Sequence, residues 1–195
     1  MSRIKDLESR LETTEKELRL VQKISRLMSR EIHLADALES IVSLVVEFMQ
    51  CDSCLLYLLQ DSELVLCTSN TRRPDTIGRV RLRLGEGLTG WVARERRLLS
   101  VSREAYLDPR FKLFSDLPED TYEAFLSAPI LLRNRVLGVI NVQHRDPHFH
   151  TGGEMELLTT IGEQVGCLVA LAMMRADTVR PSEVLDVVMS PARRV

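Results

Sequence analysis

The fold is decided by the stretch Leu126-Ser127-Ala128-Pro129-Ile130-Leu131-Leu132-Arg133-Asn134-Arg135-Val136-Leu137-Gly138-Val139-Ile140-Asn141-Val142-Gln143-His144. It contains two apolar runs joined by a polar turn at residues 133–135, which predicts a β-hairpin. Both alternating faces of the runs are apolar, as in strands that other elements cover on both sides. We therefore expect a central hairpin with structure packed on each face.

Three residues interrupt this apolar pattern. Asn141 and Gln143 share one face with Leu137 and Val139, and a buried amide needs hydrogen-bond partners from the backbone, water or a ligand. Gly138 lies on the other face, where a strand glycine is typical of a close backbone approach or a bulge. The two amides are therefore candidate ligand contacts.

The remaining elements follow from the spacing of apolar residues. Helical spacing predicts helices over residues 34–49, from 87 to about 97, and from 151 to about 173, the last beginning with a capping box at Thr151-Gly152-Gly153-Glu154. Strand patterns cover residues 54–59, 64–69 and 79–84. In the last of these, Val80, Leu82 and Leu84 are expected to face inward, opposite a solvated row of arginines.

Four short segments of the chain carry a family resemblance. They are Gly85-Glu86-Gly87-Leu88-Thr89-Gly90-Trp91-Val92-Ala93-Arg94-Glu95-Arg96-Arg97, Asp108-Pro109-Arg110-Phe111, Ser127-Ala128-Pro129-Ile130 and Val136-Leu137-Gly138-Val139-Ile140-Asn141-Val142. In this order they resemble a GAF domain over residues 34–175, most closely the GAF domain that heads nitrogen-related phosphoenolpyruvate phosphotransferases. The resemblance implies an α/β fold of the α+β type, with an antiparallel sheet sandwiched by helices. It also implies a regulatory module that senses small molecules or light and is often dimeric.

Length and composition allow one domain of ordinary size with an appended segment, because 195 residues with 45% hydrophobic content can bury one core. The formal net charge of −2 gives no basic footprint for nucleic acid. No apolar run is expected to approach the roughly 20 residues that span a bilayer, and the N-terminus lacks the pattern of a signal peptide. We therefore expect a cytoplasmic protein with no nucleic-acid or membrane partner.

The N-terminal segment shows a heptad pattern, which predicts a coiled-coil helix over residues 1–33. Its seam contains Ile4, Leu7, Leu11, Thr14, Leu18 and Val21. A second copy of the chain is the simplest partner, and the alternative is that this helix folds back on its own domain. The GAF domain is placed at 34–176, with a C-terminal helix that helps to build the homodimer, and residues 177–195 form a loose tail.

The segment from Ser102 to Glu123 is predicted to be a long structured loop, and loops of this length are commonly binding loops or lids. The resemblance places a ligand between this loop and one sheet face, near the helix after Gly87. Arg110 is expected to bind a carboxylate or phosphate in a bidentate fork, whereas plain core packing is the alternative for each aromatic residue. The implied lining is Trp91, Tyr106, Arg110, Phe111, Phe114, Phe125, Ser127, Asn141 and Gln143.

No catalytic residue, metal or cofactor is assigned. Cys51-x-x-Cys54 lacks the second ligand pair of a structural zinc site, and Cys54 opens an apolar strand, so a buried thiol is expected. GAF relatives that reduce free methionine sulfoxide use cysteines in pocket-side loops, and residues 102–123 contain none. His144, His148 and His150 have two interpretations, a metal cluster or solvated turn residues, and the second is favoured.

The sequence thus predicts a non-catalytic cytoplasmic sensor. It binds a small metabolite of nitrogen or carbon metabolism and transmits the signal through a helical dimer interface to a downstream signalling protein. Two alternatives stay open, which are a thiol-based enzyme of the free methionine sulfoxide reductase type and a ligand-free dimerisation scaffold.

Overall fold

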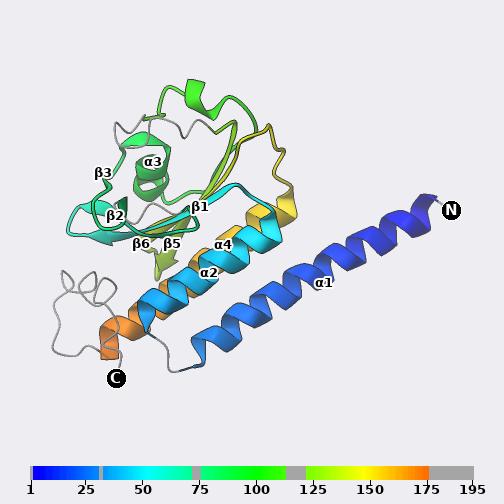
Figure 1. Cartoon of the computed structure of the whole chain (residues 1–195), viewed down its shortest axis with the longest axis horizontal. Helices are drawn as coiled ribbons and strands as arrows, with labels where there is room; N and C mark the ends of the chain where they lie inside the picture. Colours follow the sequence, from blue (N-terminus) through cyan, green and yellow to red (C-terminus); the bar gives the residue numbers. More distant parts are fainter. Residues whose placement is uncertain (1, 31–32, 72–75, 113–121, 176–195) are drawn as a thin grey trace.

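The structure is a computed structural model, and it describes residues 2–30, 33–71, 76–112 and 122–175. The tail expected at 177–195 lies outside the described residues. Figure 1 shows a curved sheet with helices on both sides. The elements in order are α1 (Ser2–Met28), α2 (Leu34–Met49), β1 (Ser53–Gln60), β2 (Glu63–Ser69), β3 (Arg81–Arg83), α3 (Gly87–Glu95), β4 (Leu99–Val101), the 3-10 helix η2 (Ala105–Leu107), β5 (Ala124–Leu132), β6 (Arg135–His144) and α4 (Gly152–Arg175).

The sheet has six strands in the order β3-β2-β1-β6-β5-β4, and each neighbouring pair is antiparallel. The predicted hairpin is confirmed as β5 and β6, which lie inside the sheet. Its two turn residues, Arg133 and Asn134, have φ values of 46° and 63°. Positive φ at both positions is the type I′ geometry that matches the twist of hairpin strands. The hairpin thus fixes the middle of the fold.

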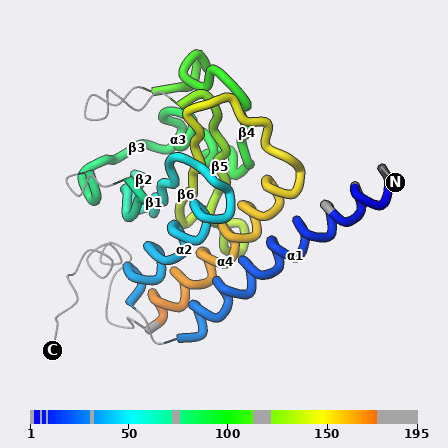
Figure 2. Tube along the Cα trace, turned by 45° about the vertical axis from the view of Figure 1, so that its right-hand side comes forward, coloured from blue at the N-terminus to red at the C-terminus, as the bar shows by residue number. Residues whose placement is uncertain are grey.

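The two faces of the sheet are covered differently. One face packs against α2 and α4, with α1 lying beside both helices, as Figure 2 shows. This face, here called the helix face, holds the larger core. That core is built from fully buried residues such as Leu38, Ile41, Leu56, Ile130, Ile140, Leu158, Ile161 and Val165. The opposite face, here called the α3 face, is covered by α3 and the segment after β4. The α/β sandwich expected from the sequence is therefore confirmed.

A bulge in the hairpin corrects one prediction about its faces. The pairing of β5 with β6 shifts between Ile130 and Leu131, so that Leu131 lies opposite Val136 and Leu137 falls at the irregularity. Leu137 consequently packs with the helix-face core, whereas Val139 packs on the α3 face. The predicted alternation of faces therefore holds only for the residues of β6 that follow the bulge. One extra residue in a strand reverses the faces of the residues that precede it.

The edge strands also differ from the sequence prediction. β3 has three residues rather than six, and Leu84 is 42% exposed, so its predicted inward position is wrong. The three arginines at 79, 81 and 83 are exposed as expected, with Arg81 in an ion pair with Glu63 at 3.5 Å. β4 was not predicted, because a three-residue strand carries too little periodicity to detect.

Helix α1 is divided between two environments. Leu20 and Ile24 in its second half are 4% and 0% exposed, because they pack against the helices of their own domain. The first half runs beyond the domain (Figure 1), and its apolar residues Ile4, Leu7 and Leu11, together with Leu18 just after the midpoint, are 55–62% exposed. The fold-back alternative thus describes the second half, and a coiled coil with a second copy stays a prediction for the first.

Helix α4 begins with the predicted capping box. The Glu154 carboxylate accepts a hydrogen bond from the Thr151 amide at 2.7 Å, and the Thr151 hydroxyl accepts one from the Glu154 amide at 3.2 Å. Contrary to the sequence expectation, the stretch Gly152–Met174 is long and apolar enough to cross a membrane. That is weak support for a membrane span, since one side of α4 packs on the sheet core through buried residues such as Leu158 and Ile161.

Candidate functional site

A row of polar side chains lies buried on the α3 face. The Ser127 hydroxyl on β5 donates a hydrogen bond to the Asn141 side-chain oxygen on β6 at 2.6 Å. The Asn141 amide nitrogen in turn donates to the Thr89 hydroxyl on α3 at 2.8 Å. All three residues are buried, so these bonds replace the water that the groups lose. The amide predicted to need a partner therefore finds one in the helix that covers it.

Gln143 continues this row toward the end of β6. It lies opposite Phe125 on β5 and Ser53 on β1 in the sheet. Its side-chain oxygen is buried and has no hydrogen-bond partner within the part of the chain that the structure describes. An unmet buried acceptor costs roughly 1–3 kcal/mol, so this oxygen is a ready acceptor for a donor from water or a ligand.

Arg110 is held by two residues of its own domain. Its Nε and Nη2 atoms donate to the Asp108 carboxylate at 2.9 and 2.7 Å. Its guanidinium carbon lies 4.6 Å from the ring centroid of Trp91 on α3, within cation–π range. The hydrogen bonds from Arg110 lower the pKa of the Asp108 carboxyl below its ordinary value. The predicted bidentate fork is present, but the carboxylate it binds belongs to the protein.

The aromatic residues of the predicted lining separate into different environments. Phe125 is buried and Phe111 is half-buried, and both pack with Leu88 and Ala105 in a small apolar cluster on the α3 face. Tyr106 is 37% exposed, and its hydroxyl binds the Glu123 carboxylate, which raises the tyrosine pKa. Phe114 lies outside the described residues, as does the rest of residues 113–121. The structure thus groups Trp91, Arg110, Phe111, Phe125, Ser127, Asn141 and Gln143 on the α3 face.

Two members of this site were not predicted as lining residues. Thr89 and Asp108 both lie within the segments that carry the family resemblance, but neither is aromatic or cationic. Asp108 precedes Arg110 by two residues, and that spacing allows a local ion pair, which is the sequence signal that identifies it. Thr89 gives no such signal, because its partner Asn141 is 52 residues away.

The cysteines are placed unfavourably for thiol chemistry. Cys51, Cys54 and Cys67 are buried, whereas Cys167 on α4 is exposed. Burial raises the pKa of Cys51 and of Cys67 to about 12, and raises that of Cys54 as well. The reactive species is the thiolate, so the three buried thiols stay protonated and unreactive near neutral pH.

This burial predicts the outcome of thiol labelling. Native protein treated with iodoacetamide at neutral pH is expected to gain one label, at Cys167, because the other thiols are neither exposed nor ionised. Unfolded protein is expected to gain four, one for each cysteine. Intact mass and peptide mapping measure both states. Native labelling of Cys51, Cys54 or Cys67 as fast as Cys167 would contradict the prediction.

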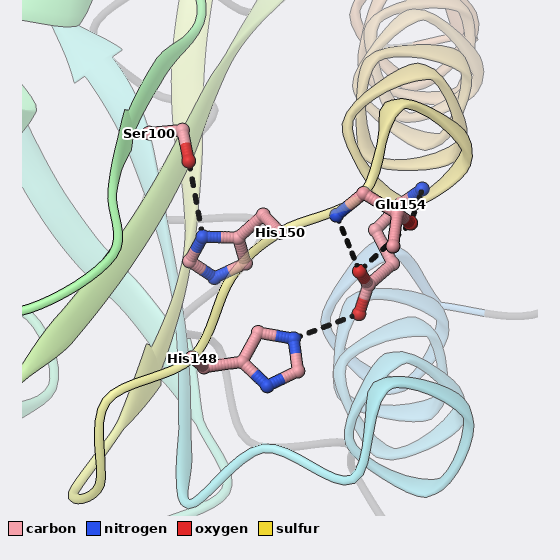
Figure 3. Close-up of polar contacts among 5 residues, drawn as sticks. Ser100, His148, His150 and Glu154 are labelled. Atoms are coloured by element: carbon pink, nitrogen blue, oxygen red, sulfur yellow. Dashed lines mark hydrogen bonds and ion pairs between the residues drawn. The ribbon is translucent and has the colours of Figure 1, made fainter.

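The histidines of the turn before α4 are not solvated as a group, which corrects the favoured interpretation. His144 and His150 are 6% and 2% exposed, and His148 is half-buried. Burial, together with the neighbouring histidines, lowers the pKa of His150 to about 4, and burial also lowers the pKa of His144. Figure 3 shows His148 directed toward Glu154 at the start of α4, and His150 directed toward Ser100.

Comparison with known proteins identifies similar chains and folds. Residues 33–169 match the family model described as the GAF domain. The Nif-specific regulatory protein of Azospirillum lipoferum is 23% identical over 181 residues, which cover 89% of this chain and 29% of that protein. The chain therefore spans less than a third of the length of this curated relative.

Two solved structures illustrate the structural similarity. The GAF domain of a phosphoenolpyruvate-protein phosphotransferase from Coxiella burnetii superposes with a TM-score of 0.78 and 25% identity, covering 84% of this chain and 98% of that one. The free methionine-R-sulfoxide reductase of Neisseria meningitidis, solved with its substrate, gives a TM-score of 0.70 at 14% identity, covering 82% and 92%. At that identity the second likeness concerns the fold alone.

Proposed function

The chain belongs to the GAF domain family, and from this premise we propose that it is a regulatory domain that binds a small metabolite on the α3 face of its sheet. The family match and the similarity to a Nif-specific regulatory protein support a regulatory role. The resemblance to phosphotransferase GAF domains suggests a metabolite of nitrogen or carbon metabolism as the ligand.

This proposal rests mainly on the buried side-chain oxygen of Gln143, which has no described hydrogen-bond partner. It continues the polar row of Ser127, Asn141 and Thr89. Apolar sheet faces that only support a fold do not need such groups, because burying them costs free energy unless every bond is made. A ligand that donates to the Gln143 oxygen recovers that cost. Arg110 adds a positive charge over Trp91 on the same face, and the Asp108 carboxylate binds its guanidinium in the way a ligand carboxylate does.

The signal passes to the helices on the opposite face. In this proposal two copies of the chain pair through the exposed half of α1 and through α4, whose Leu171 and Met174 are 53% and 68% exposed. A ligand changes how these helices pack only if it binds one arrangement more tightly than the other. The protein acts in the cytoplasm, and a downstream signalling protein reads the state of the paired helices.

We also propose that the domain is not a thiol enzyme. Structures of free methionine sulfoxide reductases share this fold, which is why the alternative has to be considered. The buried and protonated state of Cys51, Cys54 and Cys67 argues against it. Turnover of free methionine sulfoxide by purified protein, lost in a Cys54→Ser, Cys67→Ser double variant, would reverse this part of the proposal.

Thermal unfolding in the presence of a metabolite panel tests ligand binding. The panel contains amino acids, dicarboxylic acids and sugar phosphates, and native mass spectrometry of the freshly purified protein adds any molecule that co-purifies. A ligand at 100 times its Kd stabilises the folded state by about 2.7 kcal/mol, which raises Tm by about 5 °C or more for a domain of this size. At least one compound is expected to give such a shift.

A matched pair of variants locates the binding site. Gln143→Leu removes the unmet acceptor on the α3 face, so its own stability is expected to be unchanged or higher, while the ligand-induced shift is lost. Gln164→Leu is the control, because its side-chain oxygen is also buried without a described partner but lies on α4. A panel without any shift, combined with intact dimers, would favour the ligand-free scaffold instead.

A further inference from the structure

Three of the four histidines in the chain meet at one place, between the end of β6 and the start of α4. One ring nitrogen from each of His144, His148 and His150 lies within 4.8 Å of the others. The ring centroids are 4.1 to 5.6 Å apart. His144 comes from the central strand and the other two from the turn that follows it, so the hairpin and the capped helix together fix the cluster.

The nitrogens that face inward are not satisfied by the protein. The Nε2 atoms of His144 and His150 are buried and have no hydrogen-bond partner among the residues that the structure describes. Two such atoms in adjacent rings are costly to bury unless something binds them. Neutral imidazole is the form that coordinates a metal, and each of these two nitrogens offers a lone pair when its ring carries the proton on the other nitrogen.

The outward nitrogens have the partners that metal-binding histidines use. The Nε2 atom of His148 lies 3.0 Å from the Glu154 carboxylate, and the Nδ1 atom of His150 lies 3.0 Å from the Ser100 hydroxyl, as Figure 3 shows. A carboxylate that accepts from one ring nitrogen, as Glu154 does from His148, fixes the tautomer and leaves the other nitrogen to coordinate. Glu154 is itself held in place by two hydrogen bonds from Thr151, at 2.7 and 2.9 Å.

We propose that His144, His148 and His150 form a binding site for one divalent transition-metal ion, with Nε2 of His144, Nδ1 of His148 and Nε2 of His150 as ligands. Glu154 and Ser100 act as positioning residues that orient the rings of His148 and His150. Three imidazoles suit Zn²⁺, Cu²⁺, Ni²⁺ or Fe²⁺ rather than Mg²⁺ or Ca²⁺, which bind oxygen. Three protein ligands leave a fourth position for water, as in open zinc sites.

Metal binding requires a small movement of the rings. Ligand nitrogens around tetrahedral zinc are about 3.3 Å apart, given Zn–N distances of about 2.0–2.1 Å, whereas here one ring nitrogen from each histidine lies within 4.8 Å of the others. The rings of His144 and His148 are stacked with an interplanar angle of 10°, so at least one of them must rotate. His148 is half-buried and lines a groove of about 880 Å³ between α1 and the turn, which gives the ion a path inward.

This site is independent of the proposed ligand. His144 follows Gln143 in β6 and therefore points to the helix face, away from the α3 face. The ion links His144 at the end of β6 to the turn that follows, and His148 in this turn is bonded to Glu154 at the start of α4. Its expected effect is therefore to stabilise this corner of the domain.

Zinc binding to the tag-free, chelator-treated 195-residue chain tests the proposal. Isothermal titration with Zn²⁺ is expected to give one site per chain, and Co²⁺ is expected to give an absorption spectrum without a thiolate charge-transfer band. His148→Ala and His150→Ala are each expected to raise the dissociation constant for Zn²⁺ by about 100-fold or more. Glu154→Gln keeps the capping box, since glutamine also serves at that position, and is expected to weaken binding about 10-fold.

The chain offers a matched control in its fourth histidine. His33 is exposed and precedes α2, and its side chain makes no capping hydrogen bond, so His33→Ala is expected to bind Zn²⁺ like the unchanged protein. All variants carry Cys167→Ser as well, which excludes Zn²⁺ binding by the exposed thiol. The proposal would be overturned if the unchanged chain did not bind Zn²⁺ at micromolar free concentration. It would also be overturned if His148→Ala bound Zn²⁺ as tightly as His33→Ala.

Discussion

Replacing Gly138 with alanine is expected to remove a large part of the stability of the domain. A Cβ atom at Gly138 would lie 2.1 Å from the carbonyl oxygen of Tyr57 and 3.1 Å from its carbonyl carbon. Ordinary carbon–oxygen contacts between strands are about 3.3–3.6 Å. Gly138 lies opposite Leu58 in the pair of β1 with β6 and opposite Ile130 in the hairpin, so the strands on both sides hold it in place.

The expected cost is about 3 kcal/mol or more, because overpacking against backbone cannot be relieved by a side-chain rotation. Domains of this kind have a total stability of about 5–15 kcal/mol. Urea unfolding monitored by circular dichroism measures the effect, and the midpoint is expected to fall by about 1 M or more. Gly138 also lies three residues before Asn141, so loss of β6 pairing is expected to remove the polar row as well.

Gly152→Ala is the matched control for this substitution. Nothing lies within 4 Å of a Cβ built at Gly152, which is the first residue of α4. Alanine has the higher helix propensity, so the control is expected to keep or slightly increase stability. A Gly138→Ala midpoint equal to that of Gly152→Ala would mean that β1 and β6 can separate at this point, and the account of the hairpin would be wrong.

The fold could be predicted from sequence wherever the pattern was long and local. The period of α2, the runs of β5 and β6 and the capping box at Thr151 each lie within one continuous segment. The predictions failed where a single residue changed the geometry, as at the bulge that turns Leu137 to the helix face. A one-residue shift reverses faces but leaves the hydrophobic pattern unchanged.

The candidate site could be predicted only in part, because it depends on contacts between distant segments. The residue types on the α3 face followed from the family resemblance and from two amides in an apolar strand. That Arg110 binds Asp108 and that Asn141 binds Thr89 follows from side-chain geometry, which periodicity does not report. The histidines show the same limit, since a turn normally predicts exposure whereas here His144 and His150 are buried.

The exposed half of α1 gives the second prediction with a large effect, which concerns the dimer. Leu7 and Leu11 are 55% and 61% exposed and occupy successive positions of the heptad seam. A double variant, Leu7→Gln with Leu11→Gln, keeps the charge and the helix propensity but removes the apolar seam. If the seam pairs two copies, the dimer loses the burial of four leucines, at roughly 1.5 kcal/mol or more for each. The dissociation constant is therefore expected to rise about 10⁴-fold.

Sedimentation and light scattering at several protein concentrations measure this change, with dimers expected for the unchanged chain and monomers for the variant. Lys5→Gln with Glu12→Gln is the control, because both side chains are exposed and the double substitution leaves the net charge unchanged. Among the described side chains it removes the exposed ion pair between Lys16 and Glu12, and exposed pairs of this kind contribute little to stability. Dimers that persist in the leucine variant would contradict pairing through Leu7 and Leu11 and would favour α4, where Leu171 and Met174 are 53% and 68% exposed.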